Sequence, residues 1–150
     1  MTVRLSGGGR GTGLPAVDRR KLRSRAVRVL RELAHARSEL SIALVSDDEI
    51  RELNDTWRDR DEPTDVLSFS LVEGTASEYR GALLGDVVIG LETAARQARA
   101  SRRGLDDEVA RLVIHGVLHL LGHDHEEAGE ARTMRAEERR LWRAVRELDR

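Results

Sequence analysis

An apolar segment that carries four histidines constrains the fold of this chain more than any other stretch. Residues 115–125 read HGVLHLLGHDH. His115 and His119 are four residues apart, so on a helix both imidazoles leave the same face, one turn apart. Gly122 stands where that helix would end, because glycine tolerates the left-handed conformation that reverses the chain at a helix C-terminus. This reversal can bring His125 to the same point as the other two histidines.

Three neutral imidazoles around one point, with the fourth position left to water, are the pattern of a catalytic zinc site. A lone histidine on an apolar helix is more often a hydrogen-bonded core residue, but here four of the chain's five histidines fall within eleven residues. His123 is an alternative third ligand, although it follows the glycine too closely to complete the reversal. We therefore expect one zinc ion per chain, held by His115, His119 and His125.

The composition narrows the class of protein. With 150 residues the chain is long enough for a single domain with a real core, and it contains no cysteine, which excludes disulfides and thiolate zinc sites. No apolar run approaches the ~20 residues of a membrane span, and the first residues lack the apolar segment of a signal peptide, so we expect a cytoplasmic protein with no membrane partner. A net charge of -1 means that any contact with nucleic acid must come from a local patch. The four aromatic residues are too few and too scattered along the chain for a base-stacking platform.

Hydrophobic periodicity and capping signals predict the secondary structure. Ser46 and Glu49 have the spacing of a capping box, and Gly104 is expected to end the helix before it. Residues 1–15, which include the glycine-rich tract SGGGRGTG, are expected to be a loose N-terminal segment. The helices are predicted over residues 17–36, 47–57, 93–102, 106–121 and 126–148, and the strands over residues 39–45, 66–72 and 83–91.

Two of these helices carry further information. The helix over 106–121 is apolar on most sides and should be the buried central helix, whereas the one over 126–148 has a stripe of Met134, Leu141, Val145 and Leu148 for covering the core. Helix 17–36 has a basic face made of Arg19, Arg20, Arg23, Arg25 and Arg28. We interpret this face as solvated surface, and the alternative is a strip that contacts RNA. The order of the elements predicts an α+β fold with a small mixed sheet and helices packed on it.

The chain from about Leu40 to the C-terminal helix resembles the YbeY endoribonucleases of bacteria. The motifs that carry the resemblance are SIALVSDDEIRELNDTWRDRDEPTDVLSF at residues 41–69, LGDVVIG at 84–90 and HGVLHLLGHDH. The resemblance implies a mixed, mostly parallel sheet of about four strands. It also implies a single-strand-specific, zinc-dependent endoribonuclease that acts in maturation of the 3′ end of 16S ribosomal RNA and in ribosome quality control. The implied partners are single-stranded RNA, the small ribosomal subunit and the Era GTPase.

The resemblance also assigns residues. The family's zinc histidines fall on His115, His119 and His125, and its functionally important arginine falls on Arg58. There are two departures. The first strand is weak here, at about residues 3–6, and His123 stands where a tyrosine is common in the family.

Arg58 has a physical reason to act on a phosphodiester. Negative charge that develops on phosphorus needs a cation besides the metal, and a guanidinium matches phosphate oxygens in bidentate fashion. Without the resemblance, a surface salt bridge to Asp55 or Asp61 would be the preferred interpretation of Arg58. Arg60 is the alternative candidate for the arginine that binds phosphate.

Several carboxylates near these motifs have open roles. Asp124 could orient a zinc histidine by accepting its other ring proton, and Asp86 could do the same or line the cleft. Asp65 is interpreted as a turn or cap residue. Thr64, Ser68 and Asn54 are expected to shape the loop through bonds from side chain to backbone.

Two rival functions remain. The spacing His-x3-His-x5-His is also the metzincin protease pattern, but those enzymes place a Glu directly after the first histidine, where this chain has Gly116. A glycine costs about 1 kcal/mol against alanine inside a helix, which indicates close packing or space for substrate there. The other rival is a ribosome-assembly or RNA-binding factor with a structural zinc.

Overall fold

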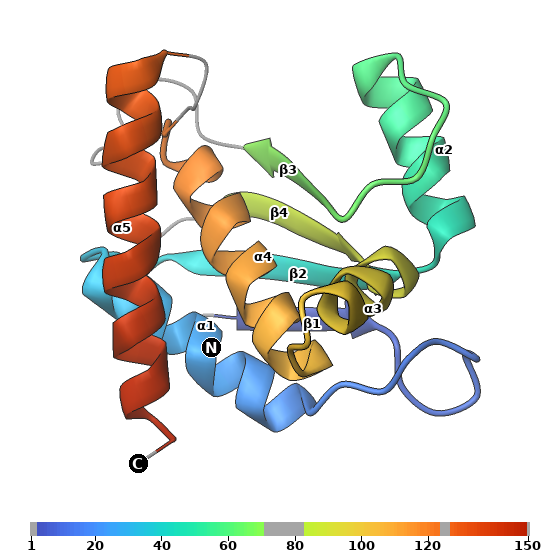
Figure 1. Cartoon of the computed structure of the whole chain (residues 1–150), viewed down its shortest axis with the longest axis horizontal. Coiled ribbons are helices and arrows are strands. Elements are labelled where there is room, and N and C mark those ends of the chain that lie inside the picture. Colours follow the sequence, from blue (N-terminus) through green and yellow to red (C-terminus); the bar gives the residue numbers. More distant parts are fainter. Residues whose placement is uncertain (1–2, 71–82, 124–126, 150) are drawn as a thin grey trace.

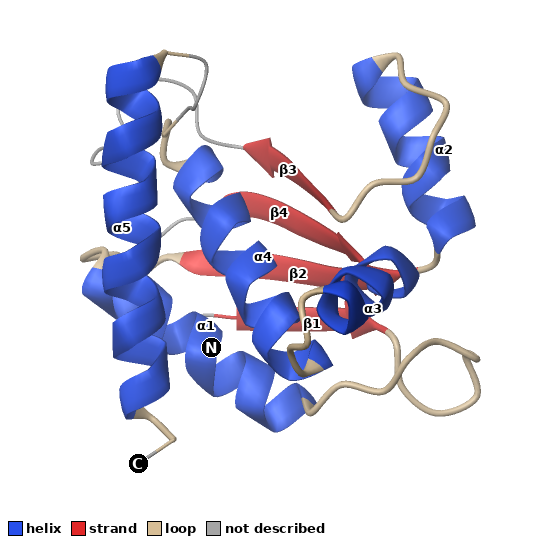
Figure 2. Cartoon of the chain, viewed as in Figure 1, coloured by secondary structure: helices blue, strands red, loops and turns tan. Residues whose placement is uncertain are grey.

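The computed structural model describes residues 3–70, 83–123 and 127–149. Within these ranges the chain forms a four-stranded sheet and five helices (Figures 1 and 2). The elements in chain order are β1 Val3–Gly7, α1 Arg19–Glu32, β2 Glu39–Val45, α2 Asp47–Arg58, β3 Val66–Ser70, β4 Leu83–Gly90, α3 Leu91–Ala100, α4 Leu105–Leu120 and α5 Ala128–Glu147. The predicted end of the second strand at residues 71–72 and the predicted loop at 73–81 lie outside the described residues.

The sheet is mixed and mostly parallel, as expected. Its strand order is β1-β2-β4-β3, with β1, β2 and β4 parallel and β3 antiparallel to β4 at one edge. The weak first strand is present, because Val3 to Gly7 pair in register with Leu40 to Leu44 of β2. Part of the N-terminal segment that was expected to be loose is therefore an edge strand.

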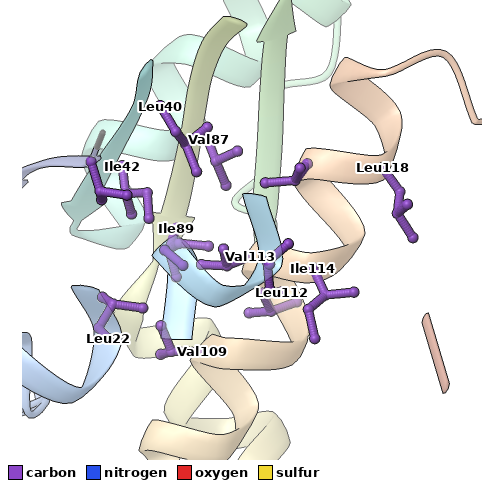
Figure 3. Close-up of a cluster of buried hydrophobic side chains, with 14 of the residues drawn as sticks. Leu22, Leu40, Ile42, Val87, Ile89, Val109, Leu112, Val113, Ile114 and Leu118 are labelled. Atoms are coloured by element: carbon purple, nitrogen blue, oxygen red, sulfur yellow. The ribbon is translucent and has the colours of Figure 1, made fainter. Parts of the chain in front are cut away.

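Helix α4 is the centre of the fold, as its all-round apolar composition predicts. It contacts α1, α3, α5, β3 and β4, and crosses in front of the sheet (Figure 1). Leu40 and Ile42 of β2 and Val87 and Ile89 of β4 are buried together with the apolar side chains of α4, such as Val113 (Figure 3). The alternate residues of the strands face the other side of the sheet, where Leu67 and Val88 pack against Ile50 of α2.

Local chemistry explains where α2 begins. The Ser46 hydroxyl accepts a hydrogen bond from the backbone N–H of Glu49, and the Glu49 carboxylate accepts one from the backbone N–H of Ser46. This reciprocal pair satisfies two backbone donors that the helix leaves without a partner. The predicted capping box is confirmed.

Two predicted helix ends are wrong for the same reason. Helix α1 ends at Glu32 rather than near residue 36, because Ala34 adopts a left-handed conformation (φ 61°) and the His35 N–H bonds to the Leu30 carbonyl. Arg102 reverses the chain after α3 in the same way, with a φ of 54°. Gly104, which was expected to end α3, instead has a φ of -69° and precedes α4 as its N-cap.

The predicted burial of two side chains also needs correction. Arg25, assigned to the basic outer face of the first helix, is only 2% exposed and lies in the interior. In α5, Met134, Leu141 and Val145 are buried as predicted, but Leu148 follows the end of the helix and is 42% exposed. Among the described residues, no helix has the length and apolar character needed to cross a bilayer.

Candidate functional site

Two of the histidines singled out by their spacing converge on α4. The Nε2 atoms of His115 and His119 lie 3.1 Å apart, and their rings meet nearly edge to face. Two nitrogens bound to one tetrahedral zinc ion, each at about 2.0–2.1 Å, would be roughly 3.3 Å apart. The pair therefore has the donor type and separation that a shared metal ion requires.

The C-terminus of α4 makes the reversal that Gly122 predicts. Gly122 has a φ of 94°, its N–H bonds to the carbonyl of His119, and the N–H of His123 bonds to the carbonyl of Leu118. These two bonds form the Schellman pattern, which satisfies the last carbonyls of a helix. The predicted turn is confirmed, because the chain reverses direction at Gly122.

The third predicted ligand, His125, lies outside the described residues, as does Asp124. His123 lines a separate hollow with Gly122 and Thr133 rather than the space beside His115 and His119. Within the part of the chain that the structure describes, no three histidine, aspartate or glutamate side chains are grouped closely enough to hold a metal ion. Of the three predicted zinc ligands, the structure thus describes the two on α4, His115 and His119.

A carboxylate from α5 lies behind the pair. Glu138 Oε1 is 3.7 Å from His115 Nδ1, the ring nitrogen that faces away from His119. Interaction with His115 lowers the pKa of Glu138, although partial burial acts in the opposite direction. A carboxylate in this position can fix the orientation of a metal-binding imidazole.

Sequence reasoning considered Asp124 for this role and missed Glu138. The signal was present, however, because Glu138 stands four residues after Met134 and three before Leu141. It therefore interrupts the apolar stripe of α5 on the side that faces the core. A charged residue within such a stripe indicates a polar partner on the neighbouring helix.

Arg58 lies across from the histidines, at the end of α2. Its guanidinium donates to the carbonyl of Ser68 at 2.9 Å and to that of Trp57 at 3.2 Å, and it lies 5.0 Å from the centre of the Phe69 ring. The alternative interpretation was a salt bridge to Asp55 or Asp61. Arg51 binds Asp61, and Arg58 forms no ion pair with Asp55 among the described residues. Arg58 is held by the edge strand β3 instead.

Arg58, His115 and His119 line one cleft of about 420 Å³. The remaining walls come mainly from β3, which runs between α2 and α4. The cleft combines a guanidinium on one side with two imidazoles on the other, an arrangement suited to a phosphate group bound between a cation and a metal. The full lining comprises Arg58, Asp65, Val66, Leu67, Ser68, Ser70, His115, His119 and Leu120.

Gly116 is packed directly against the sheet. A Cβ atom at this position would come within 2.9 Å of a Val87 methyl group and 3.0 Å of the Ser68 hydroxyl, which donates to the Gly116 carbonyl at 3.0 Å. The glycine thus serves close packing between helix and sheet, one of the two expected reasons. A glutamate here would have to enter the core, so the structure leaves no place for the general base of a metzincin.

The other polar residues have mixed positions. Asp65 accepts a hydrogen bond from the backbone N–H of Val66, as a turn residue does, and it also lines the cleft. Asn54 donates to the Glu62 carbonyl, which confirms its loop-shaping role. Asp86 has the same strand parity as Val88, which packs on the α2 side of the sheet, and it does not line the cleft.

The aromatic residues are closer in space than their spacing along the chain indicates. The rings of Trp57 and Phe69 lie 6.4 Å apart in an edge-to-face arrangement next to Arg58. Trp57 is 63% exposed. These two rings are therefore neighbours in space, and the expectation that the aromatic residues form no base-stacking platform stays a prediction.

Comparisons with known proteins agree with the geometry. A family model described as Endoribonuclease YbeY matches residues 14–146. An Endoribonuclease YbeY of Anaeromyxobacter sp. (strain Fw109-5) is 51% identical over 144 residues, which cover 96% of this chain and 72% of that protein. Another, of Anaeromyxobacter dehalogenans, is 51% identical over 125 residues, and the match covers 83% of this chain and 63% of the relative.

The fold is also similar to a solved structure. The solution structure of a protein from Thermotoga maritima matches with a TM-score of 0.66 at 30% sequence identity. The match covers 96% of this chain and 89% of that one.

Proposed function

Because the chain belongs to the YbeY endoribonuclease family, we propose that it is a zinc-dependent endoribonuclease that cleaves single-stranded RNA. The observation that carries this proposal is the cleft in which Arg58 faces the paired imidazoles of His115 and His119. In RNA, the phosphodiester is the group whose oxygens can bind both a guanidinium and a metal ion.

Arg58 binds the phosphate. A guanidinium has five N–H donors, and among the residues that the structure describes the Arg58 donors bind two carbonyls, those of Trp57 and Ser68. These two bonds hold the group at the rim of the cleft, which leaves its remaining donors for phosphate oxygens. Its charge then opposes the negative charge that develops on the phosphate during cleavage.

His115 and His119 would hold the metal, and His125 would be the third ligand. Glu138 keeps the His115 ring turned so that Nε2 faces His119. Zinc, when bound, supplies a Lewis acid that polarises a phosphoryl oxygen and activates water at neutral pH. Imidazole donors suit zinc among the divalent metals.

The proposed biological role rests on what the resemblance to the family implies. We place the enzyme in the cytoplasm, in maturation of the 3′ end of 16S ribosomal RNA and in ribosome quality control, with the small ribosomal subunit and the Era GTPase as partners. A chain with a net charge of -1 has little general attraction for RNA, so partners of this kind would supply part of the specificity.

The test is cleavage of an end-labelled single-stranded RNA by protein of measured zinc content. Wild-type protein is compared with a chelated sample, with Arg58→Ala and with His119→Ala. We expect cleavage to follow zinc content, His119→Ala to lose stoichiometric zinc, and Arg58→Ala to keep zinc and fold while losing at least about tenfold in activity, because a charge-assisted phosphate contact is removed.

Arg60→Ala is the matched control, since Arg60 is two residues away, carries the same charge and does not line the cleft. Equal losses in Arg58→Ala and Arg60→Ala would reject the role of Arg58. Near-unit zinc in His119→Ala would reject the metal assignment. Zinc binding without any RNA cleavage would favour the assembly factor with a structural zinc.

A further inference from the structure

A second hollow continues the cleft along α4. It has a volume of about 400 Å³ and shares Asp65, Val66 and His115 with the cleft. The hollow is lined by the end of α3 and by α4, and Glu138 of α5 also borders it. A strand of RNA whose phosphate lies between Arg58 and the histidines would therefore meet this hollow next.

Arg111 gives the hollow a cation that no residue in the described part of the chain binds. It stands four residues before His115, so Arg111, His115 and His119 form one stripe on α4 with about 5.4 Å between successive turns. Arg111 is exposed, and within the described residues it makes no hydrogen bond or ion pair, although its charge attracts that of Glu138. Arg103, the other arginine of the hollow, is already bound to Glu108 at 2.9 Å.

Apart from the two arginines and His115, the polar residues that line the hollow are acidic or neutral. Asp65, Glu108 and Glu138 bring negative charge, which disfavours a free multivalent anion. Gln97 and Ser101 bring neutral donors and acceptors, and these groups can pair with the edges of a base or with ribose hydroxyls. As far as the described residues show, the hollow thus combines one cation that has no bonded partner with neutral and acidic polar groups, which fits a nucleoside followed by a single phosphate.

We propose that this hollow is a nucleotide subsite, which receives the nucleotide adjoining the scissile phosphate of a single-stranded RNA. Arg111 binds the next phosphate of the strand, and Gln97 contacts the base or the ribose. One helical turn separates Arg111 from His115, comparable with the spacing of neighbouring phosphates in a single strand. The subsite rests on the proposed function, because that function places the scissile phosphate in the cleft.

Binding tests the subsite without requiring cleavage. The probe is a short, fluorescein-labelled 2′-O-methyl oligonucleotide, and its affinity for zinc-loaded protein is measured by fluorescence anisotropy over a range of salt concentrations. We expect Arg111→Ala to weaken binding roughly three- to tenfold and to reduce the slope of log K against log salt by about 0.7, the value for one phosphate contact on a single strand.

Arg143→Ala is the matched control, because Arg143 is exposed on α5, lines neither the cleft nor the hollow, and its removal changes the net charge equally. If Arg143→Ala weakens binding as much as Arg111→Ala, the effect is one of general charge and the subsite is rejected. An unchanged salt slope in Arg111→Ala would also reject it. Urea unfolding of each variant verifies that the fold is intact.

Cleavage separates the subsite from the proposed function. With bis(p-nitrophenyl) phosphate, which has no further phosphate, Arg111→Ala and wild type should have equal kcat/KM, whereas with oligoribonucleotides the variant should lose about as much as it loses in binding. If both substrates are cleaved and Arg111→Ala has no effect, the subsite is rejected and the proposed endoribonuclease function stands. If Arg111→Ala weakens binding but the wild-type protein cleaves neither substrate, the proposed endoribonuclease function is rejected and the hollow is an RNA-binding subsite.

Discussion

Gly116 shows how one residue sets both the packing and the chemistry of the site. The backbone of α4 comes so close to the sheet here that a Cβ atom would lie 2.9 Å from a Val87 methyl group. The same approach lets the Ser68 hydroxyl bond to the Gly116 carbonyl, which ties β3 to the helix between the two histidines. The absence of a side chain is therefore a structural requirement.

Gly116→Ala should lower the stability of the protein. Alanine gains about 1 kcal/mol in helix propensity, but overpacking typically costs about 1–3 kcal/mol, so we expect a net loss of roughly 1 kcal/mol. Urea unfolding measures the change. Gly129→Ala in α5, where the added methyl group meets nothing within 4 Å, serves as the control and should be neutral or slightly stabilising. A stabilised Gly116→Ala protein would contradict the packing argument.

The sequence predicted the residues of the site unevenly. His115 and His119 could be placed together because a helix fixes residues four apart on one face, and Gly122 marked the turn after them. Arg58 was assigned by resemblance, because its place opposite the histidines depends on how α2 and β3 pack on the rest of the fold. Glu138 was missed because the contact between α4 and α5 joins segments that no local pattern connects.

At the scale of the elements, α2 is joined to α3 by a small polar cluster at their N-termini. The Asp47 carboxylate accepts hydrogen bonds from the Thr93 hydroxyl and the Arg96 guanidinium, both at 2.8 Å, and the Asp47 N–H donates to Glu92. Burial raises the pKa of Asp47, but the bonds from Arg96 and Thr93 outweigh it and the pKa is lowered overall. The ionised carboxylate is thus the form that the folded state prefers.

Asp47→Asn should destabilise the protein in a way that depends on pH. A carboxyl whose folded pKa is lowered contributes stability above its unfolded pKa of about 3.9, and this contribution is lost as the pH falls through the folded value. We expect a deficit of about 1 kcal/mol at pH 7, which shrinks as the pH falls below about 4. Urea unfolding from pH 7 to pH 3 measures it.

Asp48→Asn is the control for Asp47→Asn, because Asp48 lies in the same first turn of α2 and meets the same helix dipole. A deficit of equal size in both variants, or one that stays constant with pH, would show that the cluster does not join the two helices.

Element boundaries were predicted well only where a side chain specifies them. The capping box at Ser46 located the start of α2, and the alternation of apolar residues located β2 at Glu39–Val45. The ends of α1 and α3 were misplaced because Ala34 and Arg102 take left-handed conformations that favour glycine. Backbone bonds close these turns, from the His35 N–H to the Leu30 carbonyl and from the Arg103 N–H to the Ala98 carbonyl, and no glycine marks them in the sequence.

At the scale of the whole molecule, Arg25 connects three distant parts of the chain. Its guanidinium binds Asp107 at the start of α4 and Asp149 after α5, at 3.1 and 3.0 Å, and it also donates to the Asp106 carbonyl. It lies 6.0 Å from the centre of the Trp142 ring. The side chain is 3% exposed, so its charge depends on these partners.

Arg25→Ala should destabilise the whole fold by about 2–3 kcal/mol, because it leaves a cavity and removes the partner of two carboxylates. Arg28→Ala on the same helix removes only partly exposed pairs with Glu32 and Glu147, and should cost less than about 1 kcal/mol. The midpoints of urea denaturation compare the two variants. Equal effects would mean that Arg25 is not the connecting residue.

The architecture could be predicted further than its details. Strands separated by helices, followed by an apolar helix, predict a small mixed sheet beneath a buried helix. The order β1-β2-β4-β3 does not follow from these patterns, because it depends on which strand edges pair. That order makes β3 an edge strand and thereby gives the cleft its open side.

The two walls of the cleft differ in how firmly the molecule holds them. The histidines belong to α4, whose amides should exchange with solvent only when the whole protein unfolds, whereas Arg58 ends a helix packed on the far face of the sheet beside an edge strand. Local opening of α2 would withdraw the guanidinium while the imidazoles stay in place. In the enzyme proposed above, this difference would allow product to leave while a metal bound to the histidines stays in place.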